Sequence, residues 1–253
     1  MRDRPKIHAI TTCSAAGWEQ YGKRMALSWV KHWTVTLTVW SEGFTVDVPG
    51  VLDVKLGSVR WLQDFKAQHR ALPKENYRMD AVRFAHKTAA VIEAALFEAA
   101  LGTEHLIWVD ADTVTHSRVP DPFVASLLPR GEEFISWLDR FNNYPECGFY
   151  VLNLAHPRMV ERLETWRAWY TSGELFRLAE WHDSFVLQQL VERAGLATKS
   201  LSGPKARLTS HPFINGPLGA YMDHMKGPRK AAGKSNRRDL KVARPEPYWR
   251  SIR

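Results

Sequence analysis

The first forty residues alternate between two kinds of hydrophobic pattern. Residues 6–12 (KIHAITT) are short, apolar and rich in β-branched side chains, which predicts a strand. Residues 18–33 carry apolar side chains at helical spacing, and residues 34–40 (TVTLTVW) predict a second strand. Strand, helix and strand in succession are typical of an α/β unit with parallel strands. The opening of the chain therefore predicts an α/β fold.

The same alternation continues to about Gly195. Further strands are predicted at 51–54, 104–109, 133–138 and 149–154, and further helices at 59–70, 77–100, 157–172 and 183–193. Prolines are frequent after Gly195, which predicts loops. We expect one α/β domain with a mixed sheet over residues 1–230, followed by an irregular basic tail over 231–253.

Composition excludes several classes of protein. Hydrophobic residues make up 45% of the chain and charged residues 25%, as in an ordinary globular domain and unlike a disordered chain. The longest apolar stretch, 88–101, is interrupted by Glu93 and Glu98 and is too short to span a bilayer. Two cysteines cannot make a disulfide framework, and the N-terminus lacks an apolar signal-peptide core. These features favour a cytoplasmic protein.

The excess positive charge lies at one end of the chain. The formal net charge is +8, and the last thirty residues alone hold ten basic and two acidic residues, so the rest is neutral overall. Basic residues beside Tyr248 and Trp249 suit a phosphate backbone and a stacked base. The tail therefore indicates a polyanionic partner. Contact with anionic lipid, or a segment that only solubilises the chain or closes over a ligand, are the alternatives.

Two carboxylates follow the apolar strand predicted at 104–109. Asp110 and Asp112 flank Ala111, and ligands in open α/β sheets bind beyond the carboxyl ends of the strands. Carboxylates this close repel each other unless a cation neutralises them. Oxygen ligands suit Mg²⁺ or Mn²⁺, which often share their coordination shell with phosphate oxygens. A metal site is one interpretation, and a solvated turn is the other.

A second motif, H-x-x-G-x-x-K, begins at His224. Histidine can ligate a metal, Gly227 would let the backbone approach a phosphate, and Lys230 would place a positive charge beside it. Alone, the motif is explained by the basic tail to which it belongs. Together with D-x-D it predicts a metal, a diphosphate and a cationic clamp in one site.

These two motifs, in this order, resemble those of the retaining family-8 glycosyltransferases of GT-A fold, the glycogenin and bacterial galactosyltransferase group. Residues 147–154 (CGFYVLNL) are similar to that family's N-S-G-V-x-x-I-N-L segment, and residues 182–187 (HDSFVL) resemble its D-Q-D-x-L-N segment. The resemblance implies a GT-A fold and metal-dependent transfer of a sugar, with retention, from a nucleotide-diphosphate donor. UDP is the expected nucleotide, and Mn²⁺ or Mg²⁺ the expected ion.

The resemblance also implies roles for individual residues. The metal ligands would be Asp110, Asp112 and His224. The donor would be bound by Thr11, Thr12, Arg83, Lys87, Asp110, Ala111, Gly227 and Lys230. Asp183 and Asn153 would face the reacting sugar as the catalytic candidates.

Some of these residues also have simpler explanations. Asp183 could instead cap the helix that follows it, and Arg83 and Lys87 could form an exposed helix flank. The chain departs from the family pattern at Cys147, at Ser184, and at the two alanines after Lys230. These departures bear on the sugar and the acceptor more than on the metal and the diphosphate.

The acceptor predicted from the basic tail is DNA. The sharpest version is a phage-type DNA glycosyltransferase that modifies a hydroxymethylpyrimidine, which must be flipped out of a duplex or presented in a single strand. A saccharide or lipid-linked acceptor is the alternative within the same enzyme class. A metal-dependent nuclease or nucleic-acid-binding module is the alternative from another class, but it leaves residues 148–154 and the spacing to His224 unexplained. A non-catalytic interaction protein is the third.

Overall fold

A mixed seven-stranded sheet forms the centre of the protein. The computed structural model describes residues 5–72 and 76–250. The strands, in the order β3-β2-β1-β4-β7-β6-β8, are Val51–Lys55, Leu37–Glu42, Ile7–Ser14, His105–Val109, Asn143–Asn153, Glu133–Arg140 and Ala197–Ser200. β7 runs antiparallel to both of its neighbours, and the other pairs are parallel. The predicted α/β class with a mixed sheet is confirmed.

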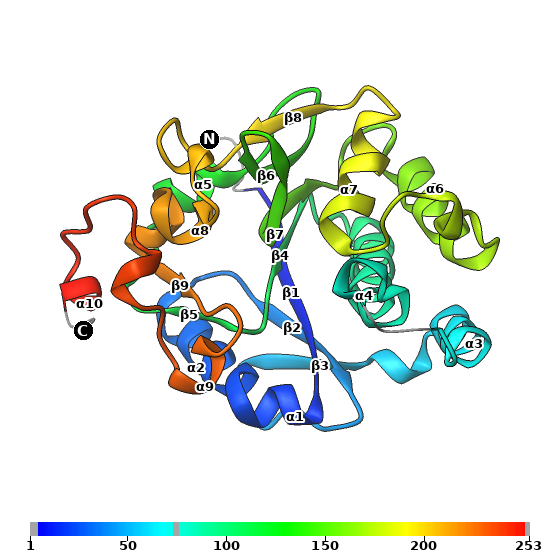
Figure 1. The fold of residues 1–253 in the computed structure, drawn as a ribbon, viewed down its shortest axis with the longest axis horizontal. Helices are drawn as coiled ribbons and strands as arrows, with labels where there is room; N and C mark the ends of the chain where they lie inside the picture. Colours follow the sequence, from blue (N-terminus) through cyan, green and yellow to red (C-terminus); the bar gives the residue numbers. More distant parts are fainter. Residues whose placement is uncertain (1–4, 73–75, 251–253) are drawn as a thin grey trace.

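Helices cover both faces of this sheet (Figure 1). On one side lie α3 (Arg60–His69), α4 (Ala81–Ala100), α6 (Met159–Thr171) and α7 (Asp183–Glu192), and on the other lie α2 (Lys23–His32), α5 (Asp121–Leu127) and α8 (Pro212–Asn215). β4 is apolar throughout because it is buried on both faces: Leu106 and Trp108 belong to one core, Ile107 and Val109 to the other. Shorter turns are η2 (Leu56–Ser58), η4 (Glu174–Arg177), η5 (Ala206–Leu208) and η6 (Pro217–Ala220).

Two predicted helices begin differently from what the periodicity indicates. The helix predicted at 18–33 starts earlier, with α1 (Ala15–Gly17), and passes through a π-helical turn, η1 (Trp18–Gly22), into α2. The helix predicted at 77–100 is divided, because η3 (Tyr77–Met79) is a 3-10 turn and the Asp80 carboxylate then accepts the amide of Arg83 as the cap of α4. A capping side chain thus sets the true start of α4.

A second, two-stranded sheet has no counterpart among the predicted elements. β5 (Thr113–Thr115) pairs antiparallel with β9 (Met222–His224), and Thr113 lies opposite His224. Strands of three residues carry too little periodicity to be recognised in a sequence. This small ribbon connects the D-x-D motif to the H-x-x-G-x-x-K motif.

The C-terminal segment is folded back against the domain. It contains α9 (Arg229–Ala232), η7 (Arg237–Asp239) and α10 (Pro247–Arg250). Trp249 is buried and its indole N–H donates to the carbonyl of Gly219, while Ser235 and Tyr248 donate hydroxyl hydrogen bonds to the buried Asp223. Residues 231–250 are thus mostly irregular, as expected, but they pack against the domain. A domain boundary at residue 230 stays a prediction.

None of the helices within residues 5–72 and 76–250 combines the length and the hydropathy that a bilayer span requires.

Candidate active site at the carboxyl ends of the central strands

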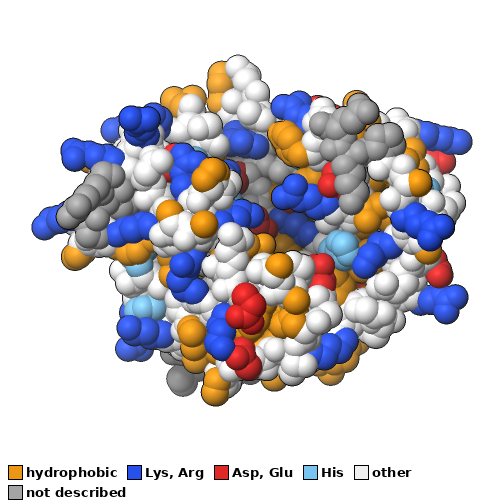
Figure 2. All heavy atoms as spheres, turned by 60° about the horizontal axis from the view of Figure 1, so that its bottom comes forward, with side chains coloured by type: hydrophobic (Ala, Val, Ile, Leu, Met, Phe, Trp, Pro, Cys, Tyr) orange, Lys and Arg blue, Asp and Glu red, His pale blue; other side chains and the backbone are white. Residues whose placement is uncertain are grey.

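A cavity of about 350 Å³ lies where β1, β2 and β4 end. Figure 2 shows the molecule hollowed on the side that Figure 1 has at the bottom, with Lys, Arg and acidic side chains around the hollow. The cavity is lined by eight of the residues implied by the family resemblance: Thr12, Arg83, Lys87, Asp110, Ala111, Asp112, Asp183 and Lys230. Most of the predicted site is therefore brought together by the fold.

The D-x-D carboxylates meet His224 at one edge of this cavity. The amide of Asp110 donates to the carbonyl of Gly148 at 2.9 Å. The amide of Met225 donates to the carbonyl of Asp112 at 3.0 Å. These bonds and the β5–β9 pairing bring Nε2 of His224 within 3.2 Å of Asp112 Oδ1 and 3.6 Å of Asp110 Oδ2. One ligand atom from each of the three residues lies within 4.8 Å of the others.

The donor set fits a divalent cation. Two carboxylate oxygens and one imidazole nitrogen suit Mn²⁺ or Mg²⁺ with open positions for phosphate. The other ring nitrogen of His224, Nδ1, lies 2.9 Å from Glu146 Oε1. A carboxylate behind a histidine in this way is the usual arrangement around metal-ligating imidazoles. Asp110, Asp112 and His224 could therefore hold the implied metal.

Cations of the protein balance the acidic pair. Lys230 Nζ lies 2.7 Å from Asp112 Oδ2 and 5.1 Å from the centre of the Tyr21 ring. Burial would raise the pKa of Asp112, but His224 and Lys230 hold that pKa well below its usual range. Burial would lower the pKa of His224, but Asp112 and Glu146 outweigh it and raise the pKa to about 9. A metal bound here would therefore displace a proton from His224.

Lys87 lies between the carboxylates of Asp110 and Asp183, across the cavity from Lys230. Its Nζ lies 2.9 Å from Asp110 Oδ1, 2.7 Å from Asp183 Oδ2 and 2.5 Å from the carbonyl oxygen of Cys147. The side chain is only 12% exposed. Burial disfavours the ammonium group, yet Asp110 and Asp183 raise the pKa of Lys87 well above its usual range. Lys87 is thus part of the site and not of an exposed helix flank, whereas Arg83 is exposed at the cavity wall.

Asp183 lines the cavity but does not cap α7, because the cap position is that of the preceding residue. It is the first residue of α7, where its Oδ1 accepts the amide of Ser184 at 2.9 Å, and it lines the cavity through the contact with Lys87. Burial would raise the pKa of Asp183, but Lys87 and His182 keep it well below the usual range. An ionised carboxylate therefore faces the cavity from a helix N-terminus, where negative charge is favoured.

Four predicted residues lie outside the cavity lining: His224, which contacts Asp112 from beside the cavity, and Thr11, Gly227 and Asn153. Thr11 is fully buried, whereas Thr12 reaches the cavity and donates to Glu42 Oε1 at 2.9 Å. Gly227 has a φ of +57°, and nothing lies within 4 Å of the place where a Cβ would be. The left-handed turn accounts for this glycine, and its approach to a phosphate stays a prediction.

The placement of Asn153 is a correction. It ends β7 opposite His105, the first residue of β4, and its side chain donates to the carbonyl of Glu133 at 3.0 Å. Because β7 is antiparallel to β4, the first part of β7 lies beside Asp110 and its end lies at the opposite edge of the sheet. The structure thus does not bring Asn153 to the site. Cys147 and Gly148, from the same segment, are the residues next to Asp110.

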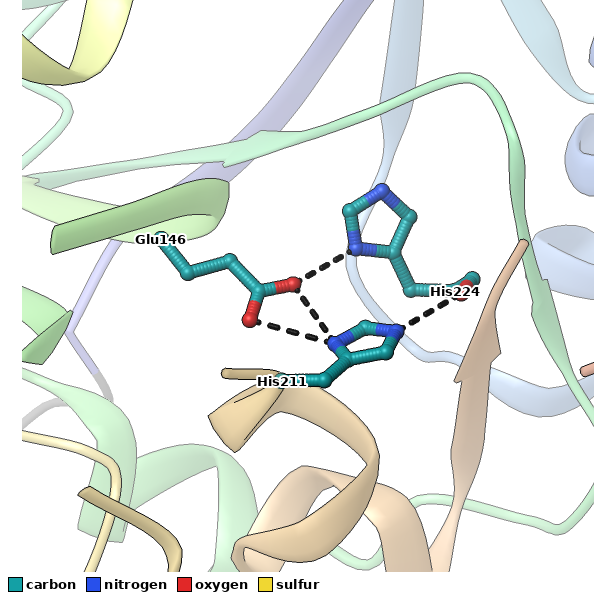
Figure 3. A group of neighbouring side chains, drawn as sticks. All are labelled: Glu146, His211 and His224. Carbon is teal, nitrogen blue, oxygen red and sulfur yellow. Dashed lines mark hydrogen bonds and ion pairs between the residues drawn. The ribbon is translucent and has the colours of Figure 1, made fainter. Parts of the chain in front are cut away.

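Glu146 is the residue that sequence reasoning missed. It is 3% exposed and contacts His211 and His224, which come from different segments (Figure 3). Lys226 Nζ lies 2.8 Å from its Oε1. The one available signal was a charged residue directly before the Cys147–Gly148 match, and it became meaningful only once the fold placed His224 beside it.

The comparisons with known proteins are structural. No family model matches the sequence, and no curated protein matches it. A glycosyltransferase involved in glycosylation of the major capsid of PBCV-1 is similar over 90% of this chain and 98% of its own, with a TM-score of 0.51 and 10% identity. Mouse xyloside xylosyltransferase 1 is similar over 78% of this chain and 85% of its own, with a TM-score of 0.48 and 10% identity. The sheet order and the likeness to the PBCV-1 enzyme show that the chain has the GT-A glycosyltransferase fold.

Proposed function

We propose that the protein is a metal-dependent, retaining glycosyltransferase that moves a sugar from a nucleotide-diphosphate donor, expected to be a UDP-sugar, to an acceptor hydroxyl. The observation that carries the proposal is the convergence of Asp110, Asp112 and His224 at one point, with Lys230 beside them, at the carboxyl ends of the strands of a GT-A fold. Chains of this fold differ widely in chemistry, so the residues of the site carry the argument and the fold supports it.

Charge decides how the donor would be held. A divalent cation bound by Asp110, Asp112 and His224 would supply positive charge to the diphosphate oxygens as the sugar departs. Lys230 lines the cavity next to Asp112 and adds a preorganised positive charge where negative charge develops. Lys87 holds Asp110 and Asp183 in place from the opposite side. A diphosphate entering the cavity would thus meet fixed cations on both sides of the acidic pair.

The transfer breaks the bond between the anomeric carbon and the β-phosphate oxygen and forms a bond from that carbon to the acceptor oxygen. The acceptor hydroxyl loses its proton, and the released diphosphate can accept it. The sugar acquires positive charge in the transition state. We propose that the ionised Asp183 stabilises that charge or attacks the carbon from the opposite face. In the second case the acceptor oxygen then displaces the carboxylate from the carbon. Both roles need the carboxylate that α7 directs at the cavity.

The proposed acceptor is a hydroxymethylpyrimidine in DNA. Arg237, Lys241 and Arg250 are exposed and line a second cavity, of about 500 Å³, in the C-terminal segment. These side chains could contact phosphates. Other cations of the segment are used within the fold, since Arg229 pairs with Asp239 and Arg244 donates to the carbonyl of Ile214. Fewer cations are thus available to contact DNA than the net charge of the segment indicates.

The aromatic pair of the segment does not support the proposed acceptor. Trp249 is buried, and the Tyr248 ring stacks on His116 with the ring centres 4.1 Å apart. Base stacking on Tyr248 and Trp249, expected from the sequence, is therefore wrong. Binding of DNA would depend on the phosphate contacts alone.

Turnover of nucleotide sugars tests the function. The protein is incubated with a panel of UDP- and other nucleotide sugars, with Mn²⁺ or with EDTA, and release of the nucleotide is measured. We expect Mn²⁺-dependent release of the nucleotide from one donor. The rate of this release should be at least 100-fold lower in Asp112→Asn. DNA with hydroxymethylpyrimidines, unmodified DNA and simple saccharides are compared as acceptors. Absence of metal-dependent release with every donor, or cleavage of the DNA instead, would contradict the proposal.

A further inference from the structure

A buried carboxylate connects the proposed metal ligand to two other parts of the chain. Glu146 lies in β7, His211 directly precedes α8, and His224 ends β9, yet their side chains meet (Figure 3). All three are less than 10% exposed. Lys226, two residues beyond His224, reaches the same carboxylate. Four residues from three separate segments thus share one charged centre beside the cavity.

The hydrogen bonds of this centre determine which nitrogen of His224 faces the acidic pair. Its Nδ1 lies 2.9 Å from Glu146 Oε1, and an ionised carboxylate can only accept, so Nδ1 carries the proton. Lys226 Nζ lies 2.8 Å from the same Oε1, and this ammonium group favours the ionised carboxylate. The remaining nitrogen, Nε2, is the one directed at Asp112 and Asp110. Glu146 therefore selects the tautomer that a metal ligand at Nε2 needs.

His211 contacts both Glu146 and the backbone of His224. Its Nδ1 lies 3.1 Å from Glu146 Oε2, and its Nε2 lies 3.0 Å from the backbone oxygen of His224. A carbonyl oxygen only accepts, so His211 donates to the same residue whose ring Glu146 orients. His211 thus constrains the backbone of β9, while Glu146 constrains the side chain.

The same group of side chains could be taken for a second metal site, because ligand atoms of Glu146, His211 and His224 also lie within 4.8 Å of one another. Its donors are already engaged. Lys226 Nζ is 2.8 Å from Glu146 Oε1, and the far nitrogen of His211 bonds to a carbonyl oxygen. An ion at this place would have to displace an ammonium group. The contacts therefore favour a role in orienting His224 toward Asp110 and Asp112 over a second metal site.

We propose that Glu146, held by His211, is a positioning residue that orients the His224 ring toward the metal and, through Lys226, ties this ligand to the loop that carries Lys230. The proposal rests on the proposed function, because it assumes that Asp110, Asp112 and His224 hold a divalent cation. It goes further in assigning the strength of metal binding to residues that do not touch the metal.

Binding of Mn²⁺ alone, without donor or acceptor, tests the proposal. The full chain is titrated with Mn²⁺, and free ion is followed by electron paramagnetic resonance. We expect Glu146→Gln and His211→Gln each to raise the dissociation constant by about 10- to 100-fold, as removal of such outer hydrogen bonds usually does. The matched control is Glu93→Gln, which removes a carboxylate bonded to Trp61 and Arg167 away from the cavity. This control should bind Mn²⁺ like the wild type.

The readouts separate positioning from a merely structural role. If Glu146 positions the ligand, saturating Mn²⁺ restores most of the turnover of Glu146→Gln, and the concentration needed rises with the dissociation constant. Folded variants of both residues that bind Mn²⁺ within twofold of the wild type would overturn this inference and leave the proposed function standing. A wild-type protein that binds no Mn²⁺ would overturn both. Circular dichroism establishes that each variant is folded before it is titrated.

Discussion

Gly148 lies against the imidazole of His224. A Cβ at Gly148 would be 2.5 Å from Cε1 and 2.7 Å from Nδ1 of that ring, closer than side-chain carbons come to other atoms. The amide of Asp110 bonds to the carbonyl of the same glycine. β4, β7 and β9 therefore meet at a point where only a hydrogen atom fits, and this contact sets how near His224 can come to the acidic pair.

Gly148→Ala should displace the ring of His224. We expect Mn²⁺ binding to weaken by at least tenfold, with a loss of about 1–3 kcal/mol in the free energy of unfolding from overpacking. Manganese titration and urea denaturation measure the two effects. Gly57→Ala is the control, because nothing lies within 4 Å of its Cβ position. Unchanged Mn²⁺ affinity in Gly148→Ala would show that the ring can move without harm to the site.

Lys87→Met should destabilise the fold. It leaves Asp110 and Asp183 without the ammonium group between them, and removal of one partner of a buried ion pair costs about 3–5 kcal/mol. Adding Asp183→Asn removes one of the unpaired charges, so the double variant should lose less than the sum of the single variants. Urea denaturation measures each. Lys23→Met, from an exposed pair with Asp47, should change the stability far less than Lys87→Met does. Strict additivity would contradict the coupling.

His116 should make the folded protein sensitive to acid. Burial lowers the pKa of His116 to about 4, whereas the unfolded chain binds that proton near pH 6.5. Between these two pKa values the unfolded state binds more protons than the folded state. The contribution of His116 to the free energy of unfolding is therefore present above pH 6.5 and is lost as the pH falls toward 4. We expect a loss of at most about 2 kcal/mol, because solvent partly reaches the ring. We expect the free energy of unfolding, measured by denaturation at pH 7.5, 6 and 5, to fall less with decreasing pH in His116→Gln than in the wild type. Parallel curves for the two proteins would refute this role of His116.

Neutralising Arg237, Lys241 and Arg250 with glutamine should weaken DNA binding. Removing one cation that pairs with a phosphate reduces the slope of log K against log salt by about 0.9 on duplex DNA. Fluorescence anisotropy over a range of salt concentrations measures this slope. The control replaces Lys31, Arg193 and Lys205, which are exposed cations outside the C-terminal segment. Substitution is preferable to deletion of the segment, because Ser235 and Tyr248 hold Asp223. Equal slopes for both triple variants would remove the argument for a DNA acceptor.

The fold class and the core of the site could be predicted from the sequence. Alternating strand and helix patterns are local properties, since the side-chain periods of 2 and 3.6 are visible within a few residues. The D-x-D motif marks the end of β4 because an apolar strand leads into it, and the H-x-x-G-x-x-K motif supplies complementary chemistry. Eight of the predicted residues line one cavity for this reason.

Other features were decided only by contacts between distant segments. The pairing of Thr113 with His224 joins strands of three residues more than a hundred positions apart, and no local pattern encodes it. The direction of β7 moved Asn153 away from the site and brought Glu146 and Gly148 into it. The charge of the C-terminal segment was partly misread, because a sequence counts Lys230 and Arg229 as excess cations while the fold gives them Asp112 and Asp239 as partners. Which charges are balanced depends on the tertiary structure, since Coulomb interactions depend on distance in space and not along the chain.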